Sequence, residues 1–209
     1  MTFKDHFSGH AAQYRLARPV YPDGFIDALC AQSPARDCCW DVGCGNGQAT
    51  VLLADRFERV IATDPSATQI AEAVPRPNID YRVEPAETSS LAAHSVSFVS
   101  VAQAYHWFDH QRFVTEVRRV AKPGAVIAAY GYRHTSVSPS IDTLVETLYA
   151  GTLGLDWPPE RCHVDAGLLD LPFPFEPLLI PPHELRVDWS LAQFLDYLRS
   201  WSASQRYVK

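Results

Sequence analysis

Residues 38–50, CCWDVGCGNGQAT, join an apolar run to a turn that contains three glycines. The run at residues 38–42 is typical of a short buried strand, and the residues from Gly47 onward predict a helix that begins inside the turn. A strand, a glycine-rich turn and a helix in direct succession form the repeating unit of parallel sheets. The stretch therefore predicts a fold of the α/β class.

The same alternation continues on both sides of this stretch. Helices are expected at residues 22–32, 47–57, 67–74 and 110–121, and strands at residues 38–42, 59–64, 79–84, 95–104 and 125–132. The fourth of these strands is continuously apolar at its end, as a strand buried on both faces should be. The pattern predicts a Rossmann-like, doubly wound, mostly parallel sheet with helices on both faces. Ligands of such sheets bind beyond the carboxyl ends of the strands.

Residues 1–209 are expected to form a single domain with four parts. These are an N-terminal helical cap at 1–36, a cofactor-binding core at 37–132, an insertion over the substrate site at 133–189 and a C-terminal helix at 190–209. The insertion is rich in proline and has no clear period. Within it, residues 140–151 predict a helix and residues 184–189 predict a strand.

Composition argues for an ordinary soluble protein and against several classes of partner. The net charge of −6 and the pI near 5.7 disfavour nucleic acid and anionic membranes as main partners. No apolar run is long enough to span a bilayer, and the N-terminus lacks the apolar core of a signal peptide. Cys38, Cys39 and Cys44 lie in or beside a predicted buried strand, which indicates reduced cysteines in a cytoplasmic protein.

The glycine turn departs from the dinucleotide-binding pattern. Dinucleotide loops have the form G-x-G-x-x-G and hold a pyrophosphate at the helix N-terminus. Here Gly43, Gly45 and Gly47 give G-x-G-x-G, and Gln48 takes the place of the last glycine. Asp41, at the strand end, would repel a pyrophosphate but attract ammonium and sulfonium charges. The turn therefore favours S-adenosylmethionine over a nicotinamide dinucleotide; the alternative is a tight turn that needs glycine only for positive φ.

Two further carboxylates follow the next two predicted strands. Asp64 ends the second strand, 19 residues after Gly45, near the spacing of about 20 residues at which an acid meets a ribose diol. Glu87 lies in the loop after the third strand, where it could accept from the adenine 6-amino group. Each has a structural alternative, as an acid near a helix N-cap for Asp64 and a solvated loop acid for Glu87. Three acids at three successive strand ends nevertheless indicate one binding edge.

Five segments resemble the successive motifs of class I S-adenosylmethionine-dependent methyltransferases of type 11. They are DVGCGNGQAT (41–50), IATDPSATQI (61–70), PAETSSL (85–91), VSVAQAYHWFD (99–109) and RRVAKPGAVIAAYGY (118–132). FSGHAAQYRLARPVYP (7–22) and LRSWSAS (198–204) are similar to those of the trans-aconitate methyltransferase branch. The resemblance runs from residue 7 to about residue 207 and implies methyl transfer to a small molecule.

The resemblance also implies cofactor contacts, position by position. Asp41, Gly43 and Gly45 would line the methionine end, and Asp64 would hold the ribose. Ala86 and Glu87 would hold the adenine, and Gln103 would form the floor beneath the sulfonium. The expected cofactor-binding set is completed by Cys44, Gly47, Pro65, Tyr14 and Arg18.

Members of this family usually continue through two more strands after the segment that resembles LRSWSAS. This sequence stops at Lys209, so the resemblance implies a sheet without its C-terminal strands. We expect the edge beyond the fifth strand to be bare or irregularly covered. We also expect poor packing from Tyr149 onward and a monomer or a weak homodimer, because a bare edge invites pairing.

Catalysis is expected just beyond the fourth strand, at Tyr105, His106 and Trp107. Methyl transfer is an in-line displacement that depends mainly on alignment and desolvation, and aromatic faces can stabilise a sulfonium. His106 could act as a general base for a hydroxyl acceptor or donate a hydrogen bond to a carboxylate. The alternative is that His106 and Trp107 only pack and position. No metal site is expected, because a helix capped at Asp109 begins between His106 and His110.

Tyr14 and Arg18 lie four residues apart in a segment expected to be helical, so they share a face. They could cap the methionine carboxylate or an acidic acceptor, or belong to a solvated amphipathic helix. We therefore predict a methyltransferase for a small-molecule acceptor, with a carboxylate as the favoured acceptor group. Two alternatives stay open: a non-catalytic S-adenosylmethionine-binding or regulatory domain, and a nicotinamide-dependent oxidoreductase.

Overall fold

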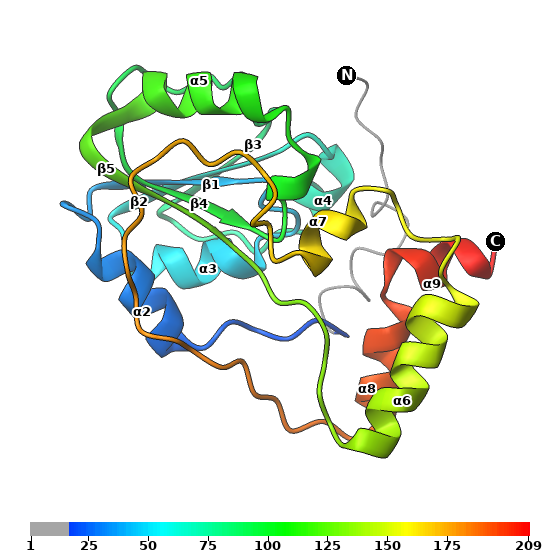
Figure 1. The fold of residues 1–209 in the computed structure, drawn as a ribbon. Helices are drawn as coiled ribbons and strands as arrows, with labels where there is room; N and C mark the ends of the chain where they lie inside the picture. Colours follow the sequence, from blue (N-terminus) through cyan, green and yellow to red (C-terminus); the bar gives the residue numbers. More distant parts are fainter. Residues whose placement is uncertain (1–16) are drawn as a thin grey trace.

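The computed structural model describes residues 17–209, and a parallel sheet lies at its centre (Figure 1). Its strands are β1 (Cys38–Val42), β2 (Arg59–Asp64), β3 (Ile79–Val83), β4 (Val96–Ala102) and β5 (Ala121–Tyr130), in the order β3-β2-β1-β4-β5. Every neighbouring pair is parallel. The predicted α/β fold is confirmed, although β5 begins at Ala121 rather than at residue 125.

Helices cover both faces of the sheet (Figure 1). They are α2 (Asp23–Ala31), α3 (Gln48–Ala54), α4 (Ala67–Ala71) and α5 (His110–Val120). Successive side chains of a strand point to opposite faces, and in β1 both faces are apolar. Cys39 packs in a cluster with Ile26 of α2 and Leu53 of α3, whereas Trp40 packs in another cluster with Phe113 of α5. None of the described helices is long and apolar enough to cross a bilayer.

The strand order reverses between β1 and β4. β2 and β3 extend the sheet on one side of β1, and β4 and β5 extend it on the other. Ligands of such sheets bind beyond the strand ends at this switch point. The glycine turn after β1 and the 3-10 helix η2 (Tyr105–Trp107) after β4 both lie there.

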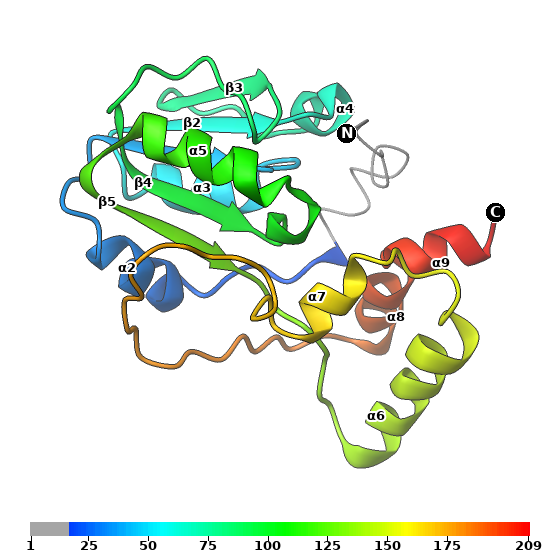
Figure 2. The ribbon, with the colours of Figure 1, turned by 45° about the horizontal axis from the view of Figure 1, so that its top comes forward.

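The C-terminal segment forms a helical layer beside the sheet (Figure 2). Its helices are α6 (Pro139–Glu146), the π-helix η3 (Thr147–Thr152), α7 (Arg161–Asp165), α8 (Leu191–Arg199) and α9 (Ser202–Tyr207). The layer has its own buried cluster, made of Val145, Tyr149, Leu153, Tyr197, Leu198, Trp201 and Ala203. The expectation of poor packing from Tyr149 onward is therefore wrong for this cluster, in which Tyr149 is 8% exposed and its ring centre lies 5.7 Å from that of Trp201. It holds for the segment between α7 and α8, where Leu169 and Leu179 are exposed.

The strand expected at residues 184–189 is absent. Residues 176–190 form neither helix nor strand and pass α2, where the ring centres of Phe25 and His183 lie 5.6 Å apart. A segment with high β-propensity forms a strand only where it can pair with another strand and pack on a surface. This segment does not pair with β5. Within residues 17–209 the sheet ends at β5. Beyond it no strand follows among the described residues, and Phe175 and Ile180 of the irregular segment pack against the two core clusters. This is the irregular cover that was expected for the edge.

Truncating Leu153 tests whether the C-terminal cluster is a true core. Leu153 is 2% exposed, whereas Leu155 projects into solvent. We expect Leu153→Ala to lower the free energy of unfolding by about 2–5 kcal/mol, because it leaves a cavity. The matched control Leu155→Ala should change it by less than about 0.5 kcal/mol. Urea unfolding followed by circular dichroism measures both, and equal effects would show that the layer is loosely packed.

Candidate functional site

The glycine turn after β1 is fixed to the ends of β2 and β4. Positive φ angles of 66°, 54° and 83° occur at Gly43, Gly45 and Gly47. The amides of Gly43 and Cys44 donate to the Thr63 carbonyl at 2.8 and 3.0 Å. A Cβ at Gly43 would lie 2.6 Å from the Cβ of Ala104, so only glycine fits where the turn meets the segment after β4.

Asp41 is a fully buried carboxylate just before this turn. Its Oδ2 accepts a 2.6 Å hydrogen bond from the Thr50 hydroxyl, which the sequence did not predict. Its Oδ1 is buried without a hydrogen-bond partner in the described part of the chain. Burial raises the pKa to about 6, while the hydroxyls of Thr50 and Ser100 lower it and Asp64 raises it further. A cationic group beside Oδ1 would replace the solvation that burial removes.

Asp64 joins the glycine turn to the end of β2. Its Oδ2 accepts from the Gly45 amide at 2.9 Å, and its Oδ1 accepts from the Ser66 amide at 2.8 Å. The predicted spacing therefore does bring Asp64 to the turn, and the neighbouring Pro65 is half-buried. The ribose contact of Asp64 stays a prediction.

The loop after β3 reaches the start of α5. Glu87 Oε1 accepts from the Asp109 amide at 2.9 Å, a structural role that the sequence did not predict. Ala86 is buried in the cluster that contains Trp40. Glu87 Oε2 accepts no hydrogen bond from residues 17–209. The adenine contacts of both residues stay predictions.

Gln103 lies where β4 ends, in a left-handed conformation with a φ of 55°. Its amide donates to the Tyr130 carbonyl at 2.9 Å, and its Nε2 donates to the Tyr132 carbonyl at 3.1 Å. These bonds hold the end of β4 against the end of β5. Such a conformation is uncommon for a residue other than glycine, and it occurs most often at ligand sites. Its predicted place beneath the sulfonium stays a prediction.

Tyr105 packs in the core although it was predicted as a catalytic residue. It is 1% exposed, its hydroxyl donates to the Pro172 carbonyl, and burial raises its pKa to about 12. This geometry indicates a packing role for Tyr105, whose catalytic role stays a prediction. His106 and Trp107 are half-buried, with ring centres 4.6 Å apart.

The pKa of His106 is lowered to about 4. Burial is the largest cause, followed by the positive charges of Arg161, His163 and His110. The imidazole is therefore neutral near pH 7 and a weak base. Arg161, the first of these neighbours, is itself paired with Asp165 at 3.1 Å.

Arg18 contacts the C-terminal layer. Its guanidinium lies 5.4 Å from the ring centre of Tyr197, and its Nη2 donates to the Ser200 carbonyl at 3.2 Å. Tyr14 lies outside the described residues, so the predicted shared face is untested. The cofactor contacts of both stay predictions.

Arg161, on α7, is a residue that sequence reasoning missed. Its Nε donates to the Tyr149 hydroxyl at 2.8 Å and to Asp165 Oδ1 at 3.1 Å. α7 contacts η2, which brings Arg161 to the predicted catalytic residues. The four-residue spacing of Arg161 and Asp165 is a signal in the sequence, but the prolines before it conceal the short helix.

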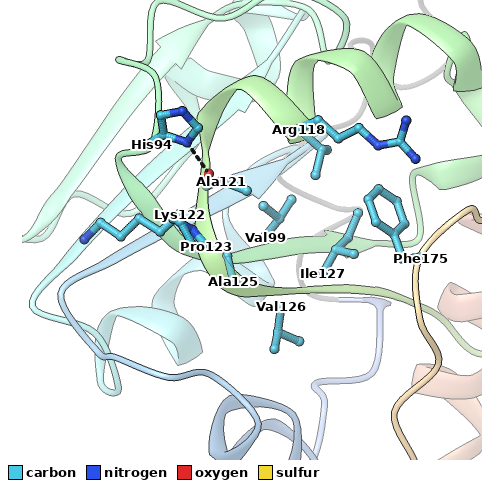
Figure 3. A pocket seen from close by; sticks show the side chains of 11 residues that line it. His94, Val99, Arg118, Ala121, Lys122, Pro123, Ala125, Val126, Ile127 and Phe175 are labelled. Carbon is cyan, nitrogen blue, oxygen red and sulfur yellow. Dashed lines mark hydrogen bonds between the residues drawn. The ribbon is translucent and has the colours of Figure 1, made fainter.

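A cavity of about 310 Å³ lies elsewhere, between α5 and the start of β5 (Figure 3). Val99, Val117 and Ile127 line it together with His94 and Lys122. It is remote from the carboxyl ends of the strands, so it is not the predicted site. Within residues 17–209, no three potential metal ligands come together.

Comparisons with known proteins identify relatives of the whole chain. Residues 40–129 match the family described as a methyltransferase domain. A candidate methyltransferase of Dictyostelium discoideum is 33% identical over 213 residues, covering 99% of this chain and 80% of the relative. The solved structure of a candidate type II methyltransferase from Anaeromyxobacter dehalogenans is 48% identical, with a TM-score of 0.84 over 91% of this chain and 81% of that one.

A shorter similarity links the chain to an uncharacterized methyltransferase of Mycobacterium tuberculosis. The two are 35% identical over 119 residues, or 56% of this chain. The matched part spans 48% of the mycobacterial protein, about half of its length.

Ligand binding at the glycine turn should be linked to a proton on Asp41. Its pKa of about 6 exceeds the unfolded value of about 3.9. Its protonation therefore stabilises the free fold below about pH 4, and this contribution is lost as the pH rises through 6. An ammonium ligand needs the charged form, so affinity for S-adenosylhomocysteine should fall by up to about tenfold per pH unit below pH 6.

Titration calorimetry at pH 5 and pH 7 measures this linkage. The control Asp41→Asn should bind more weakly at pH 7 and lose most of the pH dependence. An equal wild-type affinity at the two pH values would contradict the placement of the ammonium at Asp41.

Proposed function

This chain belongs to the class I S-adenosylmethionine-dependent methyltransferases, and we propose that it methylates a carboxylate oxygen of a small-molecule acceptor. When bound, S-adenosylmethionine supplies an electrophilic methyl carbon on its sulfonium. Membership of the family removes the nicotinamide-dependent and non-catalytic alternatives. The resemblance to the trans-aconitate branch supports an acidic acceptor.

The residues around the glycine turn fit this cofactor. The buried Oδ1 of Asp41 lacks a partner among residues 17–209 and suits an ammonium group. Gly43 and its neighbours allow the backbone to approach a ligand closely, and the carboxylate of Asp64 lies beside the turn, where its Oδ2 accepts from the Gly45 amide. We assign cofactor contacts to Asp41, Gly43, Cys44, Gly45, Gly47, Asp64, Pro65, Ala86, Glu87 and Gln103, with Tyr14 and Arg18 as the predicted cap.

The environment of His106 is the observation that carries the acceptor class. A hydroxyl acceptor must lose a proton, and a general base is most effective when its pKa lies near the working pH. The pKa of His106 is about 4, chiefly because the side chain is buried, so the neutral imidazole is a weak base. A carboxylate is already a nucleophile and needs no base. Its negative charge also suits the guanidinium of Arg161, whose charge acts on His106.

We propose that residues 133–189 cover the acceptor. α7, which belongs to this segment, contacts η2, and the Pro172 carbonyl accepts from the Tyr105 hydroxyl. Such a cover would exclude water from the charges of donor and acceptor, which strengthens their electrostatic interactions. His106 and Trp107 would orient the acceptor beneath it.

A paired acceptor assay tests the proposed function. Labelled S-adenosylmethionine is offered with small mono-, di- and tricarboxylic acids and with alcohols of the same carbon skeletons. We expect label in acids, and we expect His106→Gln to lower kcat/KM by less than about tenfold. Loss of a general base would instead cost about 10²–10⁴-fold. Methylation of the alcohols alone would contradict the acceptor class.

The pH profile of the same reaction gives a second test. Because the pKa of His106 is about 4, the imidazole is neutral throughout the range from pH 5.5 to 8. With S-adenosylmethionine saturating at every pH, so that the proton on Asp41 does not limit the rate, we therefore expect no rise of kcat/KM for the acceptor centred on pH 6–7. A rise near pH 6.5 that disappears in His106→Gln would show that His106 is a general base.

A further inference from the structure

We propose that Arg161 recognises the anionic group of the methyl acceptor, a role that rests on the carboxylate acceptor proposed above. α7 carries Arg161 and contacts η2, which holds His106 and Trp107. In both ribbon views α7 lies beside the turn that follows β4 (Figure 1 and Figure 2). The side chain of Arg161 is 21% exposed, so it is partly desolvated yet still accessible to a ligand.

One edge of the Arg161 guanidinium is held by the protein, and the other edge is open. Nε donates to the Tyr149 hydroxyl and to Asp165 Oδ1. Nη1 and Nη2 make no hydrogen bond with the part of the chain that the structure describes. Two parallel N–H groups of an arginine match the two oxygens of a carboxylate. The open edge can therefore bind one carboxylate in a bidentate manner.

Aromatic side chains fix the orientation of this guanidinium. Its central carbon lies 5.3 Å from the ring centre of Tyr149 and 4.8 Å from that of Trp157. A hydrogen bond also holds the Trp157 ring to the backbone of Tyr149, because Trp157 Nε1 donates to the Tyr149 carbonyl at 2.9 Å. A side chain that is already ordered loses little conformational entropy when it binds a ligand.

Arg161 belongs to a network of paired charges in which residues 17–209 do not use its Nη1 and Nη2. Asp165 is its ion-pair partner, and the Tyr149 hydroxyl donates to both Asp165 oxygens at 2.8 and 2.7 Å. His163 pairs with Asp170 at 2.7 Å, and His134 Nε2 lies 3.6 Å from Asp165 Oδ1. Arg161 also acts on the predicted catalytic residues: after burial, its charge is the next cause that lowers the pKa of His106.

Anion binding to the enzyme saturated with S-adenosylhomocysteine tests the role of Arg161. The probes are succinate, glutarate and citrate, and the uncharged succinamide is the control. Their binding is measured by calorimetry and by tryptophan fluorescence. Loss of a desolvated bidentate contact in Arg161→Gln should weaken acid binding at least about 30-fold. Affinity for S-adenosylhomocysteine should stay within about twofold. Arg186→Gln, which removes the same charge from an exposed pair with Glu184, should leave acid binding unchanged.

Two further variants distinguish anion recognition from a folding defect. Arg161→Lys keeps the charge but loses the pair of parallel N–H groups, so it should recover only part of the acid affinity. Asp165→Asn removes a negative charge beside the guanidinium and should tighten acid binding by about 2–5-fold, which an unfolded variant cannot do.

The outcomes separate this inference from the proposed function. Acid binding that is lost in Arg161→Gln, with no acid methylated by the wild type, would support the anion site and refute the acceptor class. Methylation of acids with a KM unchanged in Arg161→Gln would overturn the role of Arg161 and leave the acceptor class standing. A wild type that binds none of the three acids would also overturn it.

Discussion

The hydrogen bond from the Gly45 amide to the Asp64 carboxylate joins the ends of β1 and β2, and the cofactor edge depends on it. The amides of Gly43 and Cys44 also donate to the end of β2, where both bind the Thr63 carbonyl. Buried backbone amides need partners, and here one strand end satisfies three of them. The turn is therefore already shaped in this structure, so a ligand would bind to it without having to fold it.

The same geometry separates charge along the switch point. Asp41 and Asp64 lie on the side of β1 and β2, close enough for Asp64 to contribute to the raised pKa of Asp41. Arg161 acts on the other side, around η2, where it contributes to the lowered pKa of His106. A cationic methyl donor would suit the acids, and the anionic acceptor proposed above would suit Arg161. Electrostatic complementarity of this kind orients ligands more than it adds affinity, which suits a reaction limited by alignment.

The sequence predicts the core well because β1, β2 and β4 are buried on both faces. Their apolar runs, and the acids at their ends, are local signals that survive without knowledge of the fold. Residues 184–189 have an equally good local pattern and form no strand, because pairing depends on what lies beside them. Arg161 was missed for a related reason. Its partners Tyr149 and Trp157 come from outside α7, so only the folded chain brings them together.

Tyr149 links the stability of the C-terminal layer to the acceptor side of the site. Its ring packs against Trp157 and Trp201 in the buried cluster, with ring centres 4.6 and 5.7 Å away. Its hydroxyl accepts from Arg161 and donates to Asp165. The cofactor residues after β1 and β2 belong to other elements. Binding functions are commonly placed on segments that a rigid scaffold supports. If Arg161 recognises the acceptor as proposed, substitutions within the C-terminal layer would alter that recognition through Tyr149.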